Sequence, residues 1–247
     1  MYICSLKQFA MEIIFQLTED GSHTLYVPAL DEHYHSTHGA IQESKHVFID
    51  AGLKPKQCVS SKLNILEIGF GTGLNAFLTL LEGDKMKTEI HYTTLEQFPL
   101  SICEVEKLNY PTLLPNVENG TELFRKLHNA PWEEESSITP YFTLLKRHVD
   151  VCQKEFLTFA HQFNLIYFDA FAPDKQPDIW SEPLFETLFS FCQPHAILTT
   201  YCAKGSVRRM IQSVGFYVER LPGPPGKREM LRAIKQQSYV DVTTPTN

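Results

Sequence analysis

Apolar and polar residues alternate along the chain in a way that predicts strands followed by helices. From residue 64 onward, short apolar runs are separated by longer stretches whose apolar residues recur at helical spacing. The strands are expected at 64–68, 90–95, 141–145, 164–168, 196–201, 215–221 and 229–234. The helices are expected at 73–82, 99–109, 120–128, 151–159, 182–191 and 204–214. This alternation is typical of a largely parallel sheet covered on both faces.

The two ends of the pattern differ from its middle. Residues 12–30 hold two apolar stretches separated by Asp20-Gly21, a strong hairpin signal, and a helix is expected at 37–50. The last two strands have only PGPPG (222–226) between them, which predicts an antiparallel hairpin.

These patterns predict the domain organisation. We expect an N-terminal β-hairpin and helix extension over residues 1–60 and one α/β domain over residues 61–240. The acidic segment PWEEESSITP (131–140) reads as a surface loop within that domain.

Composition narrows the class of protein. The 247 residues, 43% of them hydrophobic, suffice for one sizeable core, and the net charge of −7 does not indicate nucleic acid. Six cysteines without a C-x-x-C pair favour reduced thiols and a cytoplasmic location. No apolar run reaches the ~18 residues of a membrane span, and the N-terminus does not resemble a signal peptide. Either Met1 or Met11 is the expected start.

The segment NILEIGFGTGLN (64–75) predicts a cofactor site, because it reads as a strand, a glycine turn and a helix. Leu74 stands where a dinucleotide fingerprint has its third glycine, so the spacing does not fit a dinucleotide. The Glu67 carboxylate would repel phosphate and suits a positively charged cofactor, such as S-adenosyl-L-methionine. The expected contacts of this cofactor are Glu67, Gly69, Gly71, Gly73 and Asn75.

Carboxylates follow two further predicted strands. Glu96 ends the second strand, where an acidic residue accepts hydrogen bonds from ribose hydroxyls. Asp169 ends the strand LIYF and precedes Phe171 and Pro173. A carboxylate there can accept a hydrogen bond from an attacking amine, and the ring can stack on a base. The alternatives are an exposed strand end for Glu96 and a helix N-cap for Asp169. Trp180 is either a core anchor or part of the substrate wall.

Basic residues gather late in the chain and predict contacts with a phosphate backbone. The candidates are Lys204, Arg208, Arg209, Lys227 and Arg228. Ordinary solvated charge is the alternative. His33, His35 and His38 lie close together, but no matching carboxylate spacing accompanies them, so we expect no metal.

The motifs together resemble the methyltransferase half of the bifunctional tRNA 5-methylaminomethyl-2-thiouridine biosynthesis (MnmC) family. The matching segments cover residues from about 30 to 235 and are YHSTHGAIQESKHVF, LEIGFGTGLN, LEQFPL, FDAFAPDKQPDIW, SVRRMIQSVGF and GKREML. The resemblance implies a Rossmann-like class I methyltransferase fold, with a mostly parallel seven-stranded sheet, an antiparallel C-terminal hairpin and a small N-terminal hairpin.

The resemblance also implies an activity, namely methylation of the amine of 5-aminomethyl(-2-thio)uridine at the tRNA wobble position. Asp169 would sit at the amine with Phe171 shaping the pocket, and Glu43 would be a further cofactor contact. The family's Gly-Asp pair at the adenine is replaced by Arg147-His148, so Asp150 is the expected adenine contact. The family's second half, an oxidase, is not matched, and a stand-alone enzyme would need a separate enzyme to supply the amine.

Two other functions fit parts of the pattern. A class I methyltransferase acting on a small molecule or a protein amine would share the cofactor site. A polyamine-type aminopropyl transferase would have a similar fold and N-terminal hairpin, but its decarboxylated cofactor has no α-amino acid head group for Glu67 to bind.

Overall fold

The computed structural model describes residues 12–114, 117–153 and 162–237. Its main sheet comprises β4 (Lys62–Ile68), β5 (Glu89–Glu96), β6 (Glu135–Thr139), β7 (Phe142–His148), β8 (Phe163–Phe168), β9 (Cys192–Thr200), β10 (Tyr217–Pro222) and β11 (Glu229–Ile234). The strand order is β10-β11-β9-β8-β4-β5-β7-β6. The five strands from β9 to β7 in this order are parallel, whereas β10, β11 and β6 pair antiparallel.

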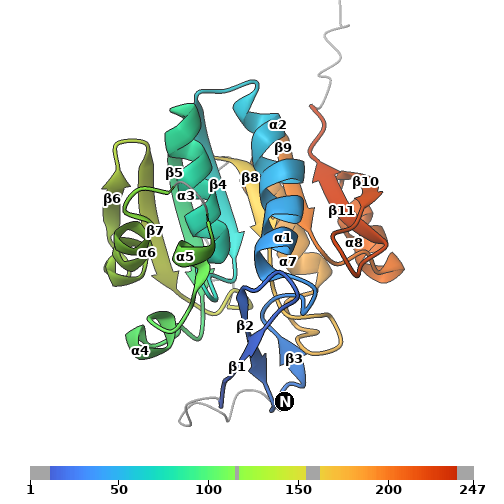
Figure 1. The fold of residues 1–247 in the computed structure, drawn as a ribbon. Coiled ribbons are helices and arrows are strands. Elements are labelled where there is room, and N and C mark those ends of the chain that lie inside the picture. The colour runs from blue at the N-terminus through green and yellow to red at the C-terminus, as the bar shows by residue number, and fades with distance from the viewer. Residues whose placement is uncertain (1–11, 115–116, 154–161, 238–247) are drawn as a thin grey trace, which may run out of the picture.

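Helices cover both faces of this sheet (Figure 1). They are α1 (Ala40–Ser44), the π-helical η1 (Lys45–Leu53), α2 (Lys54–Gln57), α3 (Leu74–Met86), α4 (Ile102–Val105), α5 (Tyr110–Leu113), α6 (Gly120–Asn129), α7 (Glu182–Phe191) and α8 (Gly205–Ser213). Within β4, Leu63 and Ile65 join the core beneath η1 and α3, and Leu66 and Ile68 join the core beneath α7 and α8. Both faces are therefore covered by apolar side chains, which explains why the adjacent residues Ile65 and Leu66 are both apolar.

The expected class I methyltransferase fold, including the C-terminal antiparallel hairpin, is thus confirmed, with differences in detail. The segment 131–140 is not only a loop, because Glu135–Thr139 forms β6 as an eighth strand at the sheet edge. Only Ile138 of this strand is buried, and Glu135 faces solvent. An edge strand tolerates such polarity and even benefits from it, which is why its sequence resembles a loop.

Two helices also differ from the expectation. The helix expected at 99–109 is reduced to the short helix α4, which starts with a capping box formed by Ser101 and Glu104. The helix α5 follows it as a separate element. The helix expected at 37–50 starts at Ala40 and continues through η1 and α2 to Gln57. Most of the helix expected at 151–159 lies outside the described residues, as do Met1 and Met11.

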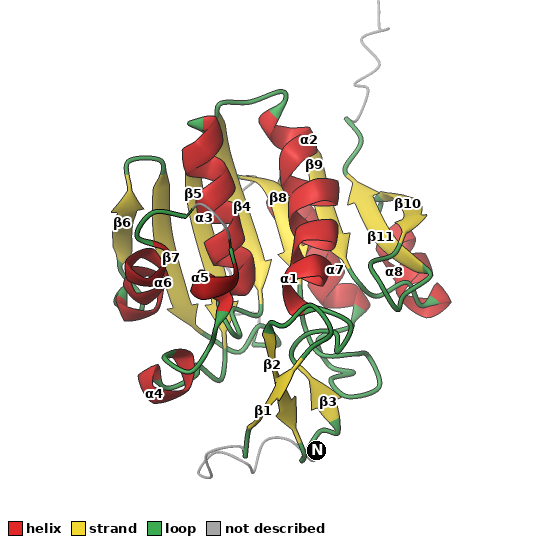
Figure 2. Ribbon diagram, viewed as in Figure 1, coloured by secondary structure: helices red, strands yellow, loops and turns green. Residues whose placement is uncertain are grey.

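The predicted N-terminal hairpin is confirmed as β1 (Ile14–Leu17) and β2 (His23–Val27), with β3 (Glu32–His33) as a third strand. Figure 2 shows this small sheet beside the carboxyl ends of the parallel strands. The chain leaving β3 contacts the glycine turn there, since His35 Nε2 lies 2.7 Å from Thr72 Oγ1. The division into 1–60 and 61–240 stays a prediction.

In the described part of the chain, no helix combines the length and apolar character that crossing a membrane requires.

The glycine turn joins the ends of three strands. Gly69 donates its N–H to Leu95 O at the end of β5, and the Asp169 N–H after β8 donates to Ile68 O. Gly69 has a φ of 92°, and a Cβ on it would lie 2.5 Å from the Asp169 carbonyl oxygen. A side chain at residue 69 would therefore both strain its own backbone and separate β4 from β8.

Gly69→Ala is expected to destabilise the fold by about 1–3 kcal/mol, with a clear fall in cofactor affinity. Denaturant unfolding and calorimetry measure the two effects. Gly205→Ala is the control, because the nearest atom to its Cβ is the flexible end of Arg209. Wild-type stability in Gly69→Ala would contradict the close approach of the two strands.

Candidate active site

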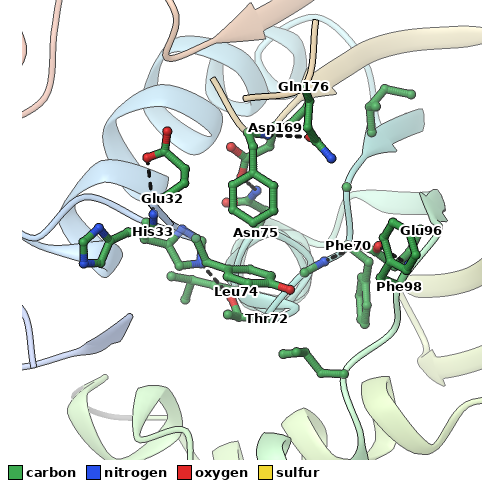
Figure 3. Close-up of a pocket in the computed structure, with 18 of the residues that line it drawn as sticks. Glu32, His33, Phe70, Thr72, Leu74, Asn75, Glu96, Phe98, Asp169 and Gln176 are labelled. Carbon is green, nitrogen blue, oxygen red and sulfur yellow. Dashed lines mark hydrogen bonds between the residues drawn. The ribbon is translucent and has the colours of Figure 1, made fainter. Parts of the chain in front are cut away.

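A cavity of about 730 Å³ lies at the carboxyl ends of β4, β5 and β8, where open parallel sheets bind their ligands. Its wall combines residues of the small sheet, the glycine turn and the loops that follow β5, β7, β8 and β9. In Figure 3, Asp169 and Asn75 lie together on one part of this wall, and Glu96 lies with Phe98 on another. Glu96, expected at the cofactor, and Asp169, expected at the acceptor, therefore border a single space.

Glu96 is held against the glycine turn. Its Oε2 accepts the Gly71 N–H at 2.9 Å, and its Oε1 accepts the Phe98 N–H at 2.7 Å. Each carboxylate oxygen keeps a further lone pair. Glu96 therefore lines the cavity in a fixed orientation and can accept hydrogen bonds from a vicinal diol, in agreement with the ribose role expected for it.

Apolar side chains form a slot beside Glu96. They come from the end of β5 and from the segments after β5, β7 and β8, and are Leu95, Phe98, Val149, Val151 and Ile179. A slot of this kind suits a flat base. The sequence alone did not single out these residues, because they share no common spacing from the predicted strands.

The expected adenine contact, Asp150, is not on the cavity wall. Its carboxylate accepts the Cys152 N–H at 3.0 Å and so caps its own turn. Arg147 forms an ion pair with Glu133, and His148 Nε2 lies 3.0 Å from Gln97 O. The apolar slot, rather than a carboxylate, borders this end of the cavity.

Asp169 lines the opposite part of the cavity and is held by Asn75. Asn75 Nδ2 donates to Asp169 Oδ2 at 2.8 Å. Burial raises the pKa of Asp169 to about 7, the Asn75 hydrogen bond acts in the lowering direction, and the nearby Glu43 raises it further. A carboxyl group with this pKa can both accept and release a proton near neutral pH.

Two aromatic rings frame the space in front of Asp169. Phe171 and Tyr34 pack edge to face with centroids 5.1 Å apart, and both line the cavity. The Phe171 loop is fixed because its N–H donates to Gln176 Oε1 and its carbonyl accepts from Trp180 Nε1. Trp180 is itself buried against Phe168, so it is a core anchor and not part of the cavity wall.

Glu43 and Lys227 form a nearly buried ion pair on the wall near Asp169. Lys227 Nζ lies 2.5 Å from Glu43 Oε1 and 3.9 Å from the centre of the Tyr201 ring. The other oxygen, Glu43 Oε2, accepts the Ser36 N–H at 2.7 Å. Glu43 thus reaches the cavity, as the cofactor prediction requires, and Lys227 reaches it as well.

Glu67 does not line the cavity. It is fully buried, where Thr94 Oγ1 donates to its Oε2 at 2.8 Å, and burial raises its pKa to about 8. The predicted direct contact between a Glu67 carboxylate and a charged cofactor therefore does not fit its position. The reason is geometric: Glu67 precedes the turn and points toward α3 and β5, where it contacts Thr94 and Asn75.

The predicted basic residues do not all face the same way. Lys227 points into the cavity, whereas Lys204 pairs with Asp174, and Arg208 donates to Gln212 Oε1. Arg209 and Arg228 are exposed. Contact of this group with nucleic acid stays a prediction.

The three clustered histidines have separate partners. His33 Nε2 lies 3.0 Å from Gln16 Oε1, His35 contacts Thr72, and His38 pairs with Glu19. In the part of the chain that the structure describes, no group of three or more metal-binding side chains is found.

Comparisons with known proteins identify a matching family and several similar proteins. A family described as "S-adenosyl-L-methionine-dependent methyltransferase" matches residues 125–236. The MnmC proteins of Leptospira borgpetersenii and Burkholderia thailandensis are 29% and 30% identical over 225 and 227 residues, which is 86% of this chain in each case. The chain spans about a third of the length of these curated relatives. The resemblance stated from the motifs is thereby confirmed, and with it the methyltransferase class and its cofactor, S-adenosyl-L-methionine.

Solved structures confirm the fold. The crystal structure of MNMC2 from Aquifex aeolicus aligns with a TM-score of 0.75 at 24% identity, over 90% of this chain and 70% of that one. A probable spermidine synthase from Corynebacterium glutamicum aligns with a TM-score of 0.50 at 16% identity, over 91% and 76%. The fold alone is therefore shared with the aminopropyl transferase alternative.

Glu96→Ala is expected to weaken binding of S-adenosyl-L-methionine about 10-fold or more, because charge-assisted hydrogen bonds to the ribose are lost. Isothermal titration calorimetry measures this. Glu122→Ala is the control, since Glu122 lies on α6 and pairs only with Lys126. An unchanged dissociation constant would remove Glu96 from the ribose site.

Proposed function

We propose that this chain, a class I methyltransferase similar to the methyltransferase part of the MnmC proteins, methylates the primary amine of 5-aminomethyl(-2-thio)uridine at the wobble position of tRNA. S-adenosyl-L-methionine would donate the methyl group, and the product would be 5-methylaminomethyl(-2-thio)uridine. Such a substrate would be met in the cytoplasm. The reaction also requires another activity that generates the primary amine.

The observation that carries this proposal is the position of Asp169 on the cavity wall, and its raised pKa supports it. An alkylamine is largely protonated at neutral pH and must lose a proton before its lone pair can attack. The ionised Asp169 carboxylate would take one proton from the ammonium group, and the neutral nitrogen would then bond to the methyl carbon as the S–C bond of the donor breaks. A carboxyl with a pKa of about 7 is well matched to this task. The cofactor supplies an already activated methyl group, so positioning supplies the rest.

The rings beside Asp169 support a nucleobase as the carrier of the amine. Phe171 and Tyr34 border the cavity on the side of the acceptor. Single-stranded loops present unstacked bases, which proteins bind by stacking on aromatic side chains. A wobble uridine turned out of the anticodon loop would lie against these rings with its aminomethyl group toward Asp169.

The basic side chains outside the cavity support a phosphate backbone near its mouth. Lys204, Arg208 and Arg209 lie at or on α8, which begins shortly after β9 at the edge of the sheet that carries the cavity. The anticodon stem would be bound by this group. Lys227 faces inward and would instead contact the bound substrates.

The deciding measurement is the mass of the nucleosides released from substrate tRNA after incubation with the purified protein. A gain of one methyl group on 5-aminomethyluridine is the expected result. A gain of an aminopropyl group would identify the polyamine-type alternative. Methylation of a free amine or a protein, with none on tRNA, would identify the other alternative, a class I methyltransferase that acts on a small molecule or a protein amine.

Asp169→Asn is expected to lower kcat about 10²–10⁴-fold with little change in cofactor affinity, because the amide cannot take the proton. Asp174→Asn, which changes a surface carboxylate paired with Lys204, is the matched control.

The wild-type rate should also depend on pH in a definite direction. Asp169 must be ionised to accept a proton, so kcat should rise with pH through about 7 and then level off. Near-normal turnover in Asp169→Asn would refute the assigned role.

Neutralising Arg208 and Arg209 together to Gln is expected to weaken tRNA binding and to reduce the slope of log K against log salt by about two. A filter-binding series over salt concentration measures this slope. The control changes Lys62 and Lys85 to Gln, because both lie at the opposite end of the sheet, at the start of β4 and the end of α3. Equal slopes in both double variants would show that the surface around Arg208 and Arg209 does not bind tRNA.

A further inference from the structure

Three buried polar atoms near the end of β4 have no hydrogen-bond partner among the described residues. They are Glu67 Oε1, Asn75 Oδ1 and Tyr92 Oη. The side chains of Asn75 and Tyr92 are within hydrogen-bonding reach of the Glu67 carboxyl. Unpaired polar atoms are costly in a protein core, so their gathering at one point requires an explanation.

Asn75 lies between two carboxyl groups. Its amide nitrogen donates to Asp169 and its carbonyl oxygen remains unpaired, while the side chain as a whole lies within reach of Glu67. An ionised Glu67 has only acceptors and cannot pair with another acceptor. A protonated Glu67 has one O–H donor, which the Asn75 oxygen can accept. The Tyr92 hydroxyl can then donate to the same carboxyl.

We propose that Glu67 is protonated in the working enzyme and donates this proton to Asn75 Oδ1, which fixes the Asn75 amide with its N–H toward Asp169. This inference rests on the proposed role of Asp169 as proton acceptor. Glu67 is then a positioning residue that acts through Asn75. No proton is transferred along the chain of contacts during the reaction.

The surroundings of Glu67 favour its protonated form. It is fully buried, and the ionisable groups that act on it are Asp169 on the loop after β8 and Tyr92 and Tyr167 on the flanking strands. None of these is a cation. Burial is the main cause that raises its pKa to about 8, and the charge of Asp169 raises it further, whereas the hydrogen bonds of Thr94, Tyr92 and Asn75 act in the lowering direction. The net effect of the surroundings is to keep the proton on Glu67 above the usual range of a glutamate.

The orientation of Asn75 determines which of the two acids can serve as the base. If the amide were reversed, its oxygen would face Asp169, and Asp169 would have to be protonated to pair with it. Proton donation from Glu67 prevents this reversal. The acidic residue before the glycine turn therefore acts on the acceptor side of the site, and not on the positive charge of the cofactor.

Glu67→Gln is the central test, because its amide N–H can donate to Asn75 Oδ1 as the protonated acid does. Cofactor affinity and kcat are expected to stay within about threefold of wild type. The acid limb of the kcat profile is expected at the same pH as in wild type. If Glu67 instead binds the cofactor as an anion, Glu67→Gln should weaken cofactor binding about 10-fold or more, and this result would overturn the proposal.

Glu67→Ala and Asn75→Ala each remove the proposed hydrogen bond that fixes the Asn75 amide. Since the Asn75 hydrogen bond lowers the pKa of Asp169, both variants should move the acid limb of the kcat profile to higher pH. Cofactor affinity should change much less than kcat. A purely structural role would lower the amount of folded protein without moving this limb, so an unmoved limb in both variants would refute the positioning role.

The proton on Glu67 can be observed without any activity. Infrared difference spectra of wild type and Glu67→Gln at pH 7 should contain the C=O band of one protonated carboxylic acid in wild type only. The folded state holds this proton between pH 4.5 and about 8, so wild-type stability should fall relative to Glu67→Gln as pH rises across that interval. Absence of the band would refute the protonated state. Presence of the band without tRNA methylation would leave the protonation intact and refute the proposed function.

Discussion

The close approach of two strand ends, where Gly69 meets the Asp169 carbonyl, is the constraint on which the site depends. A Cβ at residue 69 would lie 2.5 Å from that oxygen. Because nothing separates β4 from β8 at this point, the glycine turn and the Asp169 carboxylate border the same space. The remaining elements are arranged around this contact, with β5 placing Glu96 on one side and the small sheet covering the turn.

The electrostatics of the site follow from its burial. Two carboxyl groups lie on either side of Asn75, and burial raises the pKa of both. Glu43 brings a third acid into the same region and is neutralised by Lys227. The cavity can therefore accept a cofactor with a positive sulfonium and an amine that must become neutral, without concentrating several uncompensated negative charges.

Much of this arrangement could be predicted from the sequence, because parallel strands bring their carboxyl ends to one edge. The glycine turn, Glu96 and Asp169 were found by this rule, and Gly69, Gly71, Glu96 and Asp169 all border one cavity. The rule says nothing about side-chain direction, which is why it failed for Glu67, since that side chain turns away from the cavity into the core. It also does not predict that Asp150 caps its own turn, nor that Lys227 reaches the cavity through a partner far away in the sequence. Edge strand β6 was missed because a strand with one exposed edge needs little apolar character.

The pair of Glu43 and Lys227 also has a consequence for how the protein is made. The two residues are 184 positions apart, and Lys227 lies between β10 and β11, the last strands of the sheet. Contacts of such long range form slowly, and during synthesis they cannot form before the second partner exists. A nascent chain can therefore form its central strands and glycine turn early. The Glu43–Lys227 part of the cavity wall can form only after the hairpin of β10 and β11 has left the ribosome.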